Sequence, residues 1–367
     1  MSTGTTAPPA SLARLVDQVR AAAAAARPLT IRAGGSKDFY GHATQGERLD
    51  PRPYAGVVAY EPTELVITAR AGTPLAEIEA LLGERGQRLG FEPPHFGAEA
   101  TVGGCIAAGL AGPRRAAVGV ASGAVRDSLL GAKLLDGKAE VLSFGGTVIK
   151  NVAGYDVSRL LAGSMGTLGV LLEVSLRVAP VPALEATVRL AMPELEGVAT
   201  CTAWVRRGWP VSATAWHHGR LDVRFSGAAA AVESAIGQAG GERVEPAIAA
   251  AFWTAVREQT LPVFSGAASW WRIALPAAAA PLALPGVQLI EWGGALRWLS
   301  AGAAPAEVRA RAAALGGHAT YFRGERTDVP VFPTRPDAVR RIEARLKAQF
   351  DPAGIFNRGR MHADESA

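Results

Sequence analysis

Cysteine is scarce in this 367-residue sequence, which contains only Cys105 and Cys201. Two residues exclude a disulfide framework, and they also exclude a four-cysteine iron–sulfur cluster built within this chain. Because disulfides persist mainly in oxidising compartments, the low count favours the reducing cytoplasm. Cys105 lies in an apolar, glycine-rich run, so we interpret it as a small buried side chain rather than a redox group.

The sequence also lacks long apolar runs and clustered basic residues. No run of about 18 apolar residues occurs, and residues 1–11 have neither the positive nor the apolar region of a secretion signal. The net charge of +5 comes mostly from single arginines scattered among acidic residues, and no basic run contains aromatic residues. We therefore expect a folded protein that neither inserts directly into a membrane nor binds nucleic acid.

Two common phosphate-binding signatures are missing as well. No G-x-x-x-x-G-K-[ST] segment is present, so hydrolysis of a nucleoside triphosphate lacks its binding loop. A dinucleotide fingerprint should open a helix after a strand, with the pattern G-x-G-x-x-G. Here Gly163, Gly166 and Gly169 are spaced three apart, and the helical pattern of residues 156–162 precedes them. That order does not fit a Rossmann turn.

Three glycine-rich stretches remain, at residues 31–41 (IRAGGSKDFYG), 100–112 (ATVGGCIAAGLAG) and 141–180. The third ends in a strand pattern, in which polar Glu173 and Ser175 alternate with apolar residues. Glycine lets backbone N–H groups approach a ligand closely, and such groups hold anions. Three separated loops of this kind predict one long anionic ligand held at several points, such as a phosphate-bearing cofactor.

A change of composition marks a second domain. Two prolines within residues 177–185 (RVAPVPALE) follow the last strand of the glycine-rich region. All eight tryptophans come later, between residues 200 and 300, where short strand patterns alternate with helical patterns. This alternation predicts an antiparallel sheet with helices on one face. We expect the tryptophans in its core, although aromatic residues on strands can also line a substrate site.

Shorter patterns predict individual elements. Ser11 is expected to cap an N-terminal helix that ends before Pro28. Asp136 and Gly137 predict the turn of a hairpin. Asp156 is expected to cap the short helix that follows it.

Five motifs in order resemble the FAD-binding domain of the vanillyl-alcohol oxidase type, also called the p-cresol methylhydroxylase (PCMH) type. They are RAGGSK, ATVGGCIAAG, VRDSLLGAKLLDG, KNVAGYDVSRLLAGSMGTLGVLLEVSLRVAP and FDPAGIFNRGR. The resemblance covers nearly the whole chain and is most specific over residues 29–180 and 350–360. Within this type, the chain is most similar to the FAD-binding E subunits of bacterial glycolate oxidases.

The resemblance implies an α+β fold with four parts. Residues 1–28 would form a lead-in and a helix, and residues 29–180 a PCMH-type FAD-binding domain of two subdomains. Residues 184–330 would form an α+β cap domain with an antiparallel sheet. Residues 331–367 would form a C-terminal helix and a tail that returns to the FAD-binding domain.

The resemblance also implies which residues hold FAD. The first loop would contact the pyrophosphate through Arg32, Ala33, Gly34, Gly35, Ser36 and Lys37. The second wall of the channel would include Pro94, Thr101, Val102, Gly103, Gly104, Gly109 and Gly112. Asn151 and Gly154 belong to the KNVAGYD element near the flavin, and the adenylate end would be held by Gly163, Gly166, Thr167, Leu168 and Val170. Asn357 and Arg358 would lie near the isoalloxazine ring or the pyrophosphate.

Ser36 occupies the position that often carries a histidine in family members whose flavin is covalently attached. The resemblance therefore implies non-covalent FAD. A site for a 2-hydroxy acid would add a cation for the carboxylate and a base or metal for the hydroxyl proton. Neighbouring His217 and His218 point to opposite faces of a strand, so they and His318 are not expected to share a metal. His95 is a weaker alternative for proton transfer, and the catalytic residues stay open.

The resemblance implies a FAD-binding subunit of a glycolate oxidase, or glycolate dehydrogenase, that contributes to oxidation of glycolate to glyoxylate. Its partners would be a larger flavoprotein subunit, which oxidises the 2-hydroxy acid, and an iron–sulfur subunit, which removes electrons. Two alternatives stay open. One is a self-sufficient FAD-linked oxidase of an alcohol or hydroxy acid, and the other is a structural flavoprotein subunit without catalysis.

Overall fold

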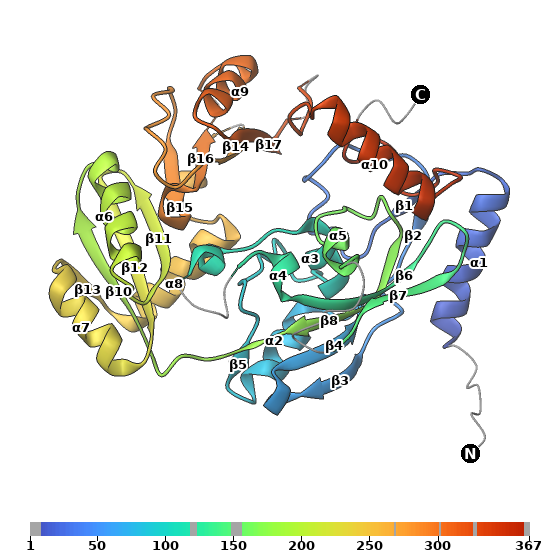
Figure 1. Ribbon diagram of the computed structural model, residues 1–367, viewed down its shortest axis with the longest axis horizontal. Helices are drawn as coiled ribbons and strands as arrows, with labels where there is room; N and C mark the ends of the chain where they lie inside the picture. Colours follow the sequence, from blue (N-terminus) through green and yellow to red (C-terminus); the bar gives the residue numbers. More distant parts are fainter. Residues whose placement is uncertain are drawn as a thin grey trace.

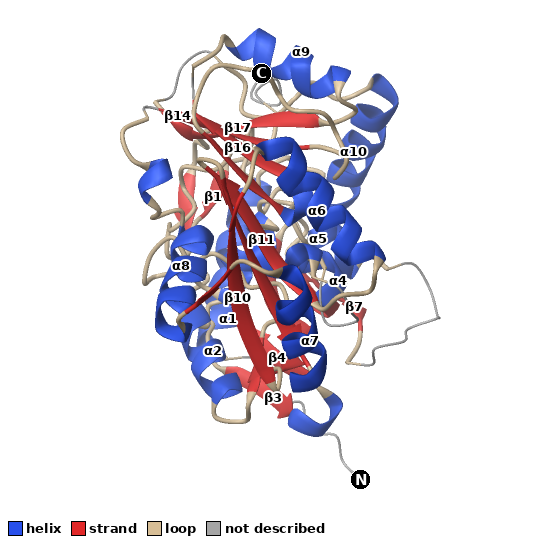
Figure 2. Ribbon diagram, turned by 90° about the vertical axis from the view of Figure 1, so that its left-hand side faces the viewer, coloured by secondary structure: helices blue, strands red, loops and turns tan. Residues whose placement is uncertain are grey.

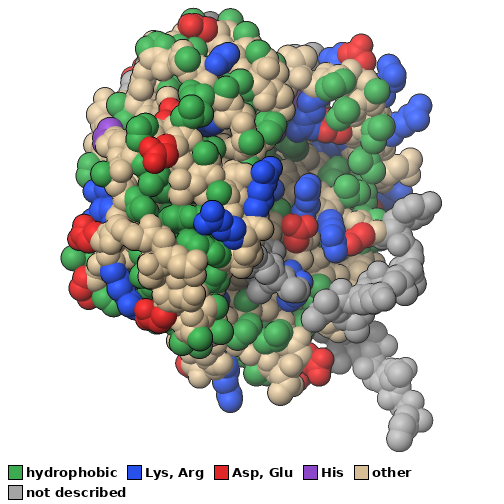
Figure 3. Space-filling model, turned by 60° about the vertical axis from the view of Figure 1, so that its left-hand side comes forward, with side chains coloured by type: hydrophobic (Ala, Val, Ile, Leu, Met, Phe, Trp, Pro, Cys, Tyr) green, Lys and Arg blue, Asp and Glu red, His purple; other side chains and the backbone are tan. Residues whose placement is uncertain are grey.

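The computed structural model describes residues 9–117, 123–147, 156–267, 269–300, 302–325 and 329–362. Figure 1 shows two bodies joined by extended segments. We call the elements from residue 10 to 180 together with those of residues 337–362 the N-terminal domain, and the elements from residue 184 to 324 the cap domain. Figure 3 shows a hollow in the surface of the molecule, with Lys and Arg side chains at its edge.

The N-terminal domain is built on a five-stranded antiparallel sheet in the order β3-β4-β8-β6-β7. Its strands are β3 (Val57–Glu61), β4 (Val66–Arg70), β6 (Leu129–Leu135), β7 (Val141–Gly145) and β8 (Val170–Arg177). Its helices are α2 (Leu75–Gly83), α3 (Val102–Ala108), α4 (Val125–Ser128) and α5 (Ser158–Leu161). The predicted hairpin at Asp136 and Gly137 is confirmed, because this turn joins β6 to β7. The prediction for Asp156 is wrong, since the N-cap of α5 is Val157.

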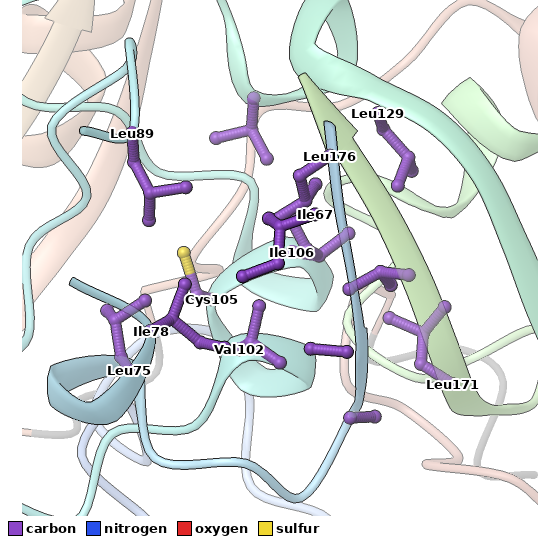
Figure 4. Packing of buried hydrophobic residues seen from close by; sticks show 14 of the residues in the cluster. Ile67, Leu75, Ile78, Leu89, Val102, Cys105, Ile106, Leu129, Leu171 and Leu176 are labelled. Atoms are coloured by element: carbon purple, nitrogen blue, oxygen red, sulfur yellow. The ribbon is translucent and has the colours of Figure 1, made fainter. Parts of the chain in front are cut away.

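Alternation of side chains places one face of this sheet against α2 and α3. Figure 4 shows Ile67 of β4 and Leu176 of β8 beside Ile106 of α3. The Cys105 sulfur lies among the same apolar side chains. Burial raises the pKa of the Cys105 thiol to about 12, so it stays protonated and packs as a small apolar group, as the sequence predicts.

A second, smaller subdomain surrounds β1 (Leu29–Ile31) and β2 (Glu47–Leu49), which pair in parallel. Helix α1 (Ala10–Ala24) packs beside them through an apolar stripe that includes Leu15 and Val19. Helix α10 (Asp337–Phe350) leads back to this subdomain, where Leu29 N donates to Ile355 O over 2.7 Å. The predicted cap at Ser11 is wrong, because the helix already begins at residue 10 and its N-cap is Pro9.

The cap domain contains an eight-stranded antiparallel sheet in the order β13-β10-β12-β11-β15-β16-β14-β17. The strands are β10 (Leu184–Ala191), β11 (Val211–His217), β12 (Arg220–Gly227), β13 (Glu242–Val244), β14 (Ser269–Ala274), β15 (Gln288–Glu291), β16 (Leu296–Ser300) and β17 (His318–Gly324). The helices are α6 (Glu194–Arg206), α7 (Ala229–Ala239), α8 (Pro246–Glu258) and α9 (Pro305–Ala314). A two-stranded pair, β5 (Gln87–Arg88) and β9 (Ala179–Pro180), stands where the chain leaves the N-terminal domain.

The two faces of the cap sheet have different neighbours. Figure 2 shows α6 and α7 on one side of the sheet and α8 on the other. The face with α8 also meets Tyr40, Leu110 and Met165 of the N-terminal domain in one apolar cluster. Six of the eight tryptophans are buried, which supports their predicted place in the core: Trp204, Trp253, Trp270, Trp271, Trp292 and Trp298.

A buried group of charges joins the two domains. Glu92 of the N-terminal domain accepts from Arg224 Nη2 of the cap over 2.8 Å, and the Arg114 guanidinium lies 3.4 Å away. A second contact between the domains has the charges reversed: Arg114 of the N-terminal domain donates through Nη2 to Glu185 of β10 in the cap over 2.5 Å. Burial alone would raise the pKa of Glu92, but Arg224 and Arg114 outweigh it and lower this pKa to about 2. The four charges therefore fix the cap against the N-terminal domain.

We expect Glu92→Gln to lower the free energy of unfolding by about 3 kcal/mol, because it removes the nearer of the two carboxylates that pair with buried Arg224 and leaves only Glu185, at 3.7 Å. The contribution of Glu92 to the free energy of unfolding is fully present above its ordinary pKa of 4.5, and it is lost as the pH falls toward its folded-state pKa of about 2. Urea denaturation at several pH values measures both effects. Asp17→Asn, in an exposed pair with Arg20, is the control and should change neither. Equal acid dependence in wild type and Glu92→Gln would contradict this account.

Candidate functional site

A cavity of about 330 Å³ opens where segments distant in the sequence meet at β1. Its walls come from β1, the loop after it, helix α3 with its N-cap, residue 165 and the segment after α10. The lining residues are Thr30, Ile31, Arg32, Ala33, Gly34, Gly35, Ser36, Lys37, Asp38, Tyr40, Ala43, Thr44, Thr101, Gly104, Ala107, Ala108, Met165, Asn357 and Arg360. The volume falls within the usual range of about 300–1,000 Å³ for small-molecule sites.

The first glycine loop forms one wall and requires glycine. A Cβ atom added to Gly34 would overlap the carbonyl oxygen of Glu99, so this position brings two backbone segments into direct contact. Gly35 has φ +72°, which L residues with a side chain rarely adopt. The loop is held by Arg32, whose Nε donates to Asp38 Oδ2 over 2.5 Å. Backbone of the two glycines therefore lines this side of the cavity, beside the longer side chains of Arg32, Lys37 and Asp38.

Helix α3 forms the opposite wall. Thr101 is its N-cap and accepts from Gly104 N over 3.2 Å, and both residues line the cavity. Val102 and Gly103 turn away, because their N–H groups donate to Thr73 O and Ala71 O, each over 2.9 Å. The TVGG motif thus divides into two residues that line the cavity and two that dock the helix on the sheet.

Asn357 connects the segments beneath the cavity. Its Oδ1 accepts from Ile31 N over 2.8 Å, and its Nδ2 donates to Met165 O over 2.7 Å. Arg358 lies outside the lining and donates to backbone carbonyls, including Ala353 O. Arg360, which the sequence analysis did not single out, lines the cavity and donates to Lys37 O over 3.2 Å.

A cation lies at the cavity edge and is held from the cap domain. Lys37 Nζ donates to His95 O over 3.1 Å, and burial lowers the pKa of its ammonium group. The N–H groups of His95 and Phe96 donate to the carboxylate of Glu258 on α8, the latter over 2.8 Å. Arg257 Nε donates to the same carboxylate over 2.7 Å. The cap domain therefore holds the backbone of residues 95 and 96, and this backbone in turn positions Lys37.

The other predicted contacts lie beside the cavity or outside the described residues. Pro94 and Gly112 border a second, smaller cavity, and Gly109 packs on Gly163, where an added Cβ would meet Gly163 Cα at 2.8 Å. Residues 166–170 do not line the 330 Å³ cavity, although Gly166 lies against the Asn357 side chain. This stretch contains the predicted contacts Gly166, Thr167, Leu168 and Val170. Asn151 and Gly154 lie outside the residues that the structure describes.

The second cavity, about 20 Å³, lies at the junction of the two domains and has room for about one water molecule. Arg272 and Glu291 line it, on the cap face that meets the N-terminal domain. Burial raises the pKa of Glu291 to about 7, although Trp298 Nε1 donates to its Oε1 over 2.7 Å. A cation beside a protonatable carboxyl is the pair that a small hydroxy acid requires, but a cavity of this size does not admit one.

The histidines singled out in the sequence have neighbours of their own in the structure. Within the described ranges, no three His, Cys, Asp or Glu side chains are close enough to hold a metal ion. His217 Nε2 lies 2.9 Å from Arg220 Nη2, and His95 Nε2 lies 2.9 Å from Glu79 Oε2. Both histidines therefore have structural partners.

Known proteins are similar to this chain in sequence. A family model described as "FAD binding domain" matches residues 6–159. Glycolate oxidase subunit GlcE of Escherichia coli (strain K12) is 45% identical over 355 residues, which are 95% of this chain and 97% of that protein. The chain belongs to the GlcE family. D-2-hydroxyglutarate dehydrogenase of Xanthomonas citri pv. viticola is 30% identical over 139 residues, which are 37% of this chain and 28% of that protein.

Solved structures of alkyldihydroxyacetonephosphate synthase are similar in fold, with a TM-score of 0.64 at 14% identity for one of them. That match covers 94% of this GlcE-family chain and 74% of the other chain. The predicted fold class, a PCMH-type FAD-binding domain with mixed helices and antiparallel sheets, is confirmed. Among the described helices, none has the length and apolar composition to cross a membrane.

The cavity of the GlcE-family chain fits the FAD that its binding domain takes. Gly34 and Gly35 place backbone in the cavity lining at positions where an added Cβ would collide with neighbouring residues, and Lys37 and Arg360 bring cations to the same lining. Amides and cations of this kind suit a pyrophosphate. When bound, FAD supplies the redox chemistry, and this chain's residues bind and orient it.

We expect Gly34→Ala to abolish retention of FAD, because its methyl group would overlap the carbonyl oxygen of Glu99 and displace the glycine loop that lines the cavity. The flavin to protein absorbance ratio of the purified protein measures this directly. Gly83→Ala is the control: it lies in α2 with no atom within 4 Å of the added Cβ, and flavin content should stay at the wild-type level. Full flavin content in Gly34→Ala would show that this loop does not contact the cofactor.

Glu258→Gln should raise the dissociation constant for FAD about tenfold, since hydrogen bonds to a charged acceptor contribute about 1.5–3 kcal/mol and hold the loop beneath Lys37. Quenching of flavin fluorescence on titration into apoprotein gives this constant. Glu233→Gln removes another Arg-paired carboxylate, far from the site in an exposed pair with Arg243, and should bind FAD as wild type does. Equal affinities in both variants would count against the positioning role of Glu258.

Proposed function

We propose that this chain is the FAD-binding subunit of a glycolate oxidase complex and contributes to oxidation of glycolate to glyoxylate. The observation that carries this proposal is the 45% identity to glycolate oxidase subunit GlcE over nearly the full length of both proteins. The cavity supports it, because segments from both ends of the described chain converge on a place suited to FAD.

In the proposed complex, FAD is held without a covalent bond. The first loop carries Ser36 at the position where a histidine would tether the flavin, and the structure gives this serine a hydrogen bond with Lys37 Nζ at 3.3 Å. The glycines at residues 163–169 and the KNVAGYD element would hold the remaining parts of the cofactor. Arg358, which lies outside the 330 Å³ cavity, contributes through the fold of the segment that carries Asn357.

Oxidation of the hydroxy acid would take place largely on a partner. The junction beside Arg272 and Glu291 has room for about one water molecule, and His217 and His95 have structural partners. We therefore propose a larger flavoprotein subunit that oxidises the substrate and an iron–sulfur subunit that carries electrons away. The two buried, unpaired cysteines agree with the cytoplasmic location expected for such an assembly, with any membrane contact made through partners.

The test is to purify the chain alone and together with the larger flavoprotein and iron–sulfur subunits of the same organism. Under anaerobic conditions, glycolate should bleach the flavin absorbance of the assembly and leave that of the single chain unchanged. Turnover of glycolate by the single chain at the rate of the assembly would overturn the proposal. Bleaching of the single chain followed by reoxidation in air would instead identify a self-sufficient oxidase.

A further inference from the structure

A cavity of about 310 Å³ lies in the cap domain between its sheet and α8, and we call it the α8 cavity. Its floor is one rung of the sheet, where Thr187 of β10 is paired with Arg224 of β12 on one side and with Val244 of β13 on the other. Helix α8 lies on this face of the sheet, opposite α6 and α7 (Figure 2). The α8 cavity shares no lining residue with the FAD cavity, and its volume falls in the same range for small-molecule sites.

The side of α8 that faces the cavity combines one large aromatic residue with small ones. Trp253 is 5% exposed, and its Nε1 donates to Thr187 Oγ1 over 2.9 Å, so the indole ring is held in place. Ala249 and Ala250, one helical turn earlier, are too small to fill the space beside it. Ala250 is exposed, so the cavity opens to solvent there. The α8 cavity thus has a fixed apolar wall and an open mouth.

The ion pairs beside the α8 cavity contain more arginines than carboxylates. Glu92 and Glu185 both line the cavity. Glu92 accepts from Arg224 and Arg114. Glu185 accepts from Arg114 and Arg88. Three arginines therefore surround two carboxylates, and this excess of positive charge favours an anionic ligand.

Arg257 of α8 supplies further donors. Three arginines line the cavity, and two of them, Arg224 and Arg243, donate through Nη atoms to carboxylates. Arg257 instead donates through Nε to Glu258 over 2.7 Å, and its Nη groups make no hydrogen bond to any residue that the structure describes. Its side chain is only 25% exposed, and polar groups so far from bulk water are usually paired. The two Nη groups of a guanidinium match the two oxygens of a carboxylate.

We propose that the α8 cavity binds a small organic carboxylate, whose oxygens pair with Arg257 and whose apolar body lies against Trp253. A cation fits less well, because arginines already hold both carboxylates of the lining. An inorganic anion fits less well too, since it would leave the apolar wall uncovered. Arg257 also borders the 20 Å³ cavity at the domain junction, but that cavity has no room for such a molecule. Because Arg257 holds Glu258, the ligand would bind next to the contacts that position Lys37.

The test measures binding of benzoate, an aromatic carboxylate, to the full-length, FAD-loaded chain by isothermal titration at constant ionic strength. Benzamide has nearly the same shape without the charge, and it should bind about tenfold more weakly or worse. Arg257→Gln should weaken benzoate binding about tenfold. Ala250→Phe, which fills the mouth of the cavity and leaves every ion pair in place, should weaken it at least as much. Ala251→Phe is the matched control and should bind benzoate as wild type does, because Ala251 is also exposed on α8 but does not line the cavity.

Flavin content and thermal midpoint are recorded for every variant, so that loss of binding is not confused with loss of folding. Equal affinities for benzoate and benzamide would overturn the anionic ligand, and wild-type affinity in Ala250→Phe would overturn the α8 cavity as its place. Inorganic phosphate that binds as tightly as benzoate would overturn the contribution of the apolar wall. Benzoate binding that appears only after FAD is removed would assign it to the FAD cavity and overturn the proposal. Each of these outcomes leaves the proposed function standing, because no step of that function uses the α8 cavity.

Discussion

The side-chain amide of Asn357 is the contact on which the cofactor cavity depends. It bridges Ile31 N and Met165 O, and the backbone N–H of the same residue donates to Leu29 O over 3.0 Å. One buried side chain thereby joins β1, the glycine-rich segment before β8 and the segment after α10. Both the donor and the acceptor of the amide are used, and a buried amide left unpaired would be costly. Few other residue types place both groups at this spacing.

The cavity also depends on the cap domain, although the cap contributes none of its lining residues. The cap reaches it through Glu258, which holds the backbone of residues 95 and 96 and so the acceptor of Lys37. The charge group around Glu92 keeps the cap at the distance that this contact requires. A movement of the cap would therefore change the electrostatic environment of the cavity without moving its own walls, which couples the two bodies.

Local sequence signals predicted the parts that local physics determines. Hydrophobic alternation and turn residues predicted the sheets. The glycine loops predicted the cavity, because only glycine allows two backbone segments to approach so closely. Helix ends at Ser11 and Asp156 were wrong by one or two residues, since tertiary contacts decide where a helix begins. Arg360, Glu258 and Glu291 were not found, because their roles arise from contacts between residues far apart in the chain, which no spacing records.

The hydrogen bonds that Asn357 makes to Ile31 and Met165 have a consequence for synthesis in the cell. Ile31 leaves the ribosome 326 residues before the side chain that secures it, so the N-terminal sheet can form long before the cofactor cavity is closed. Flavin insertion is then a late step of biogenesis, after the cap domain has been made and residues 357–360 have emerged.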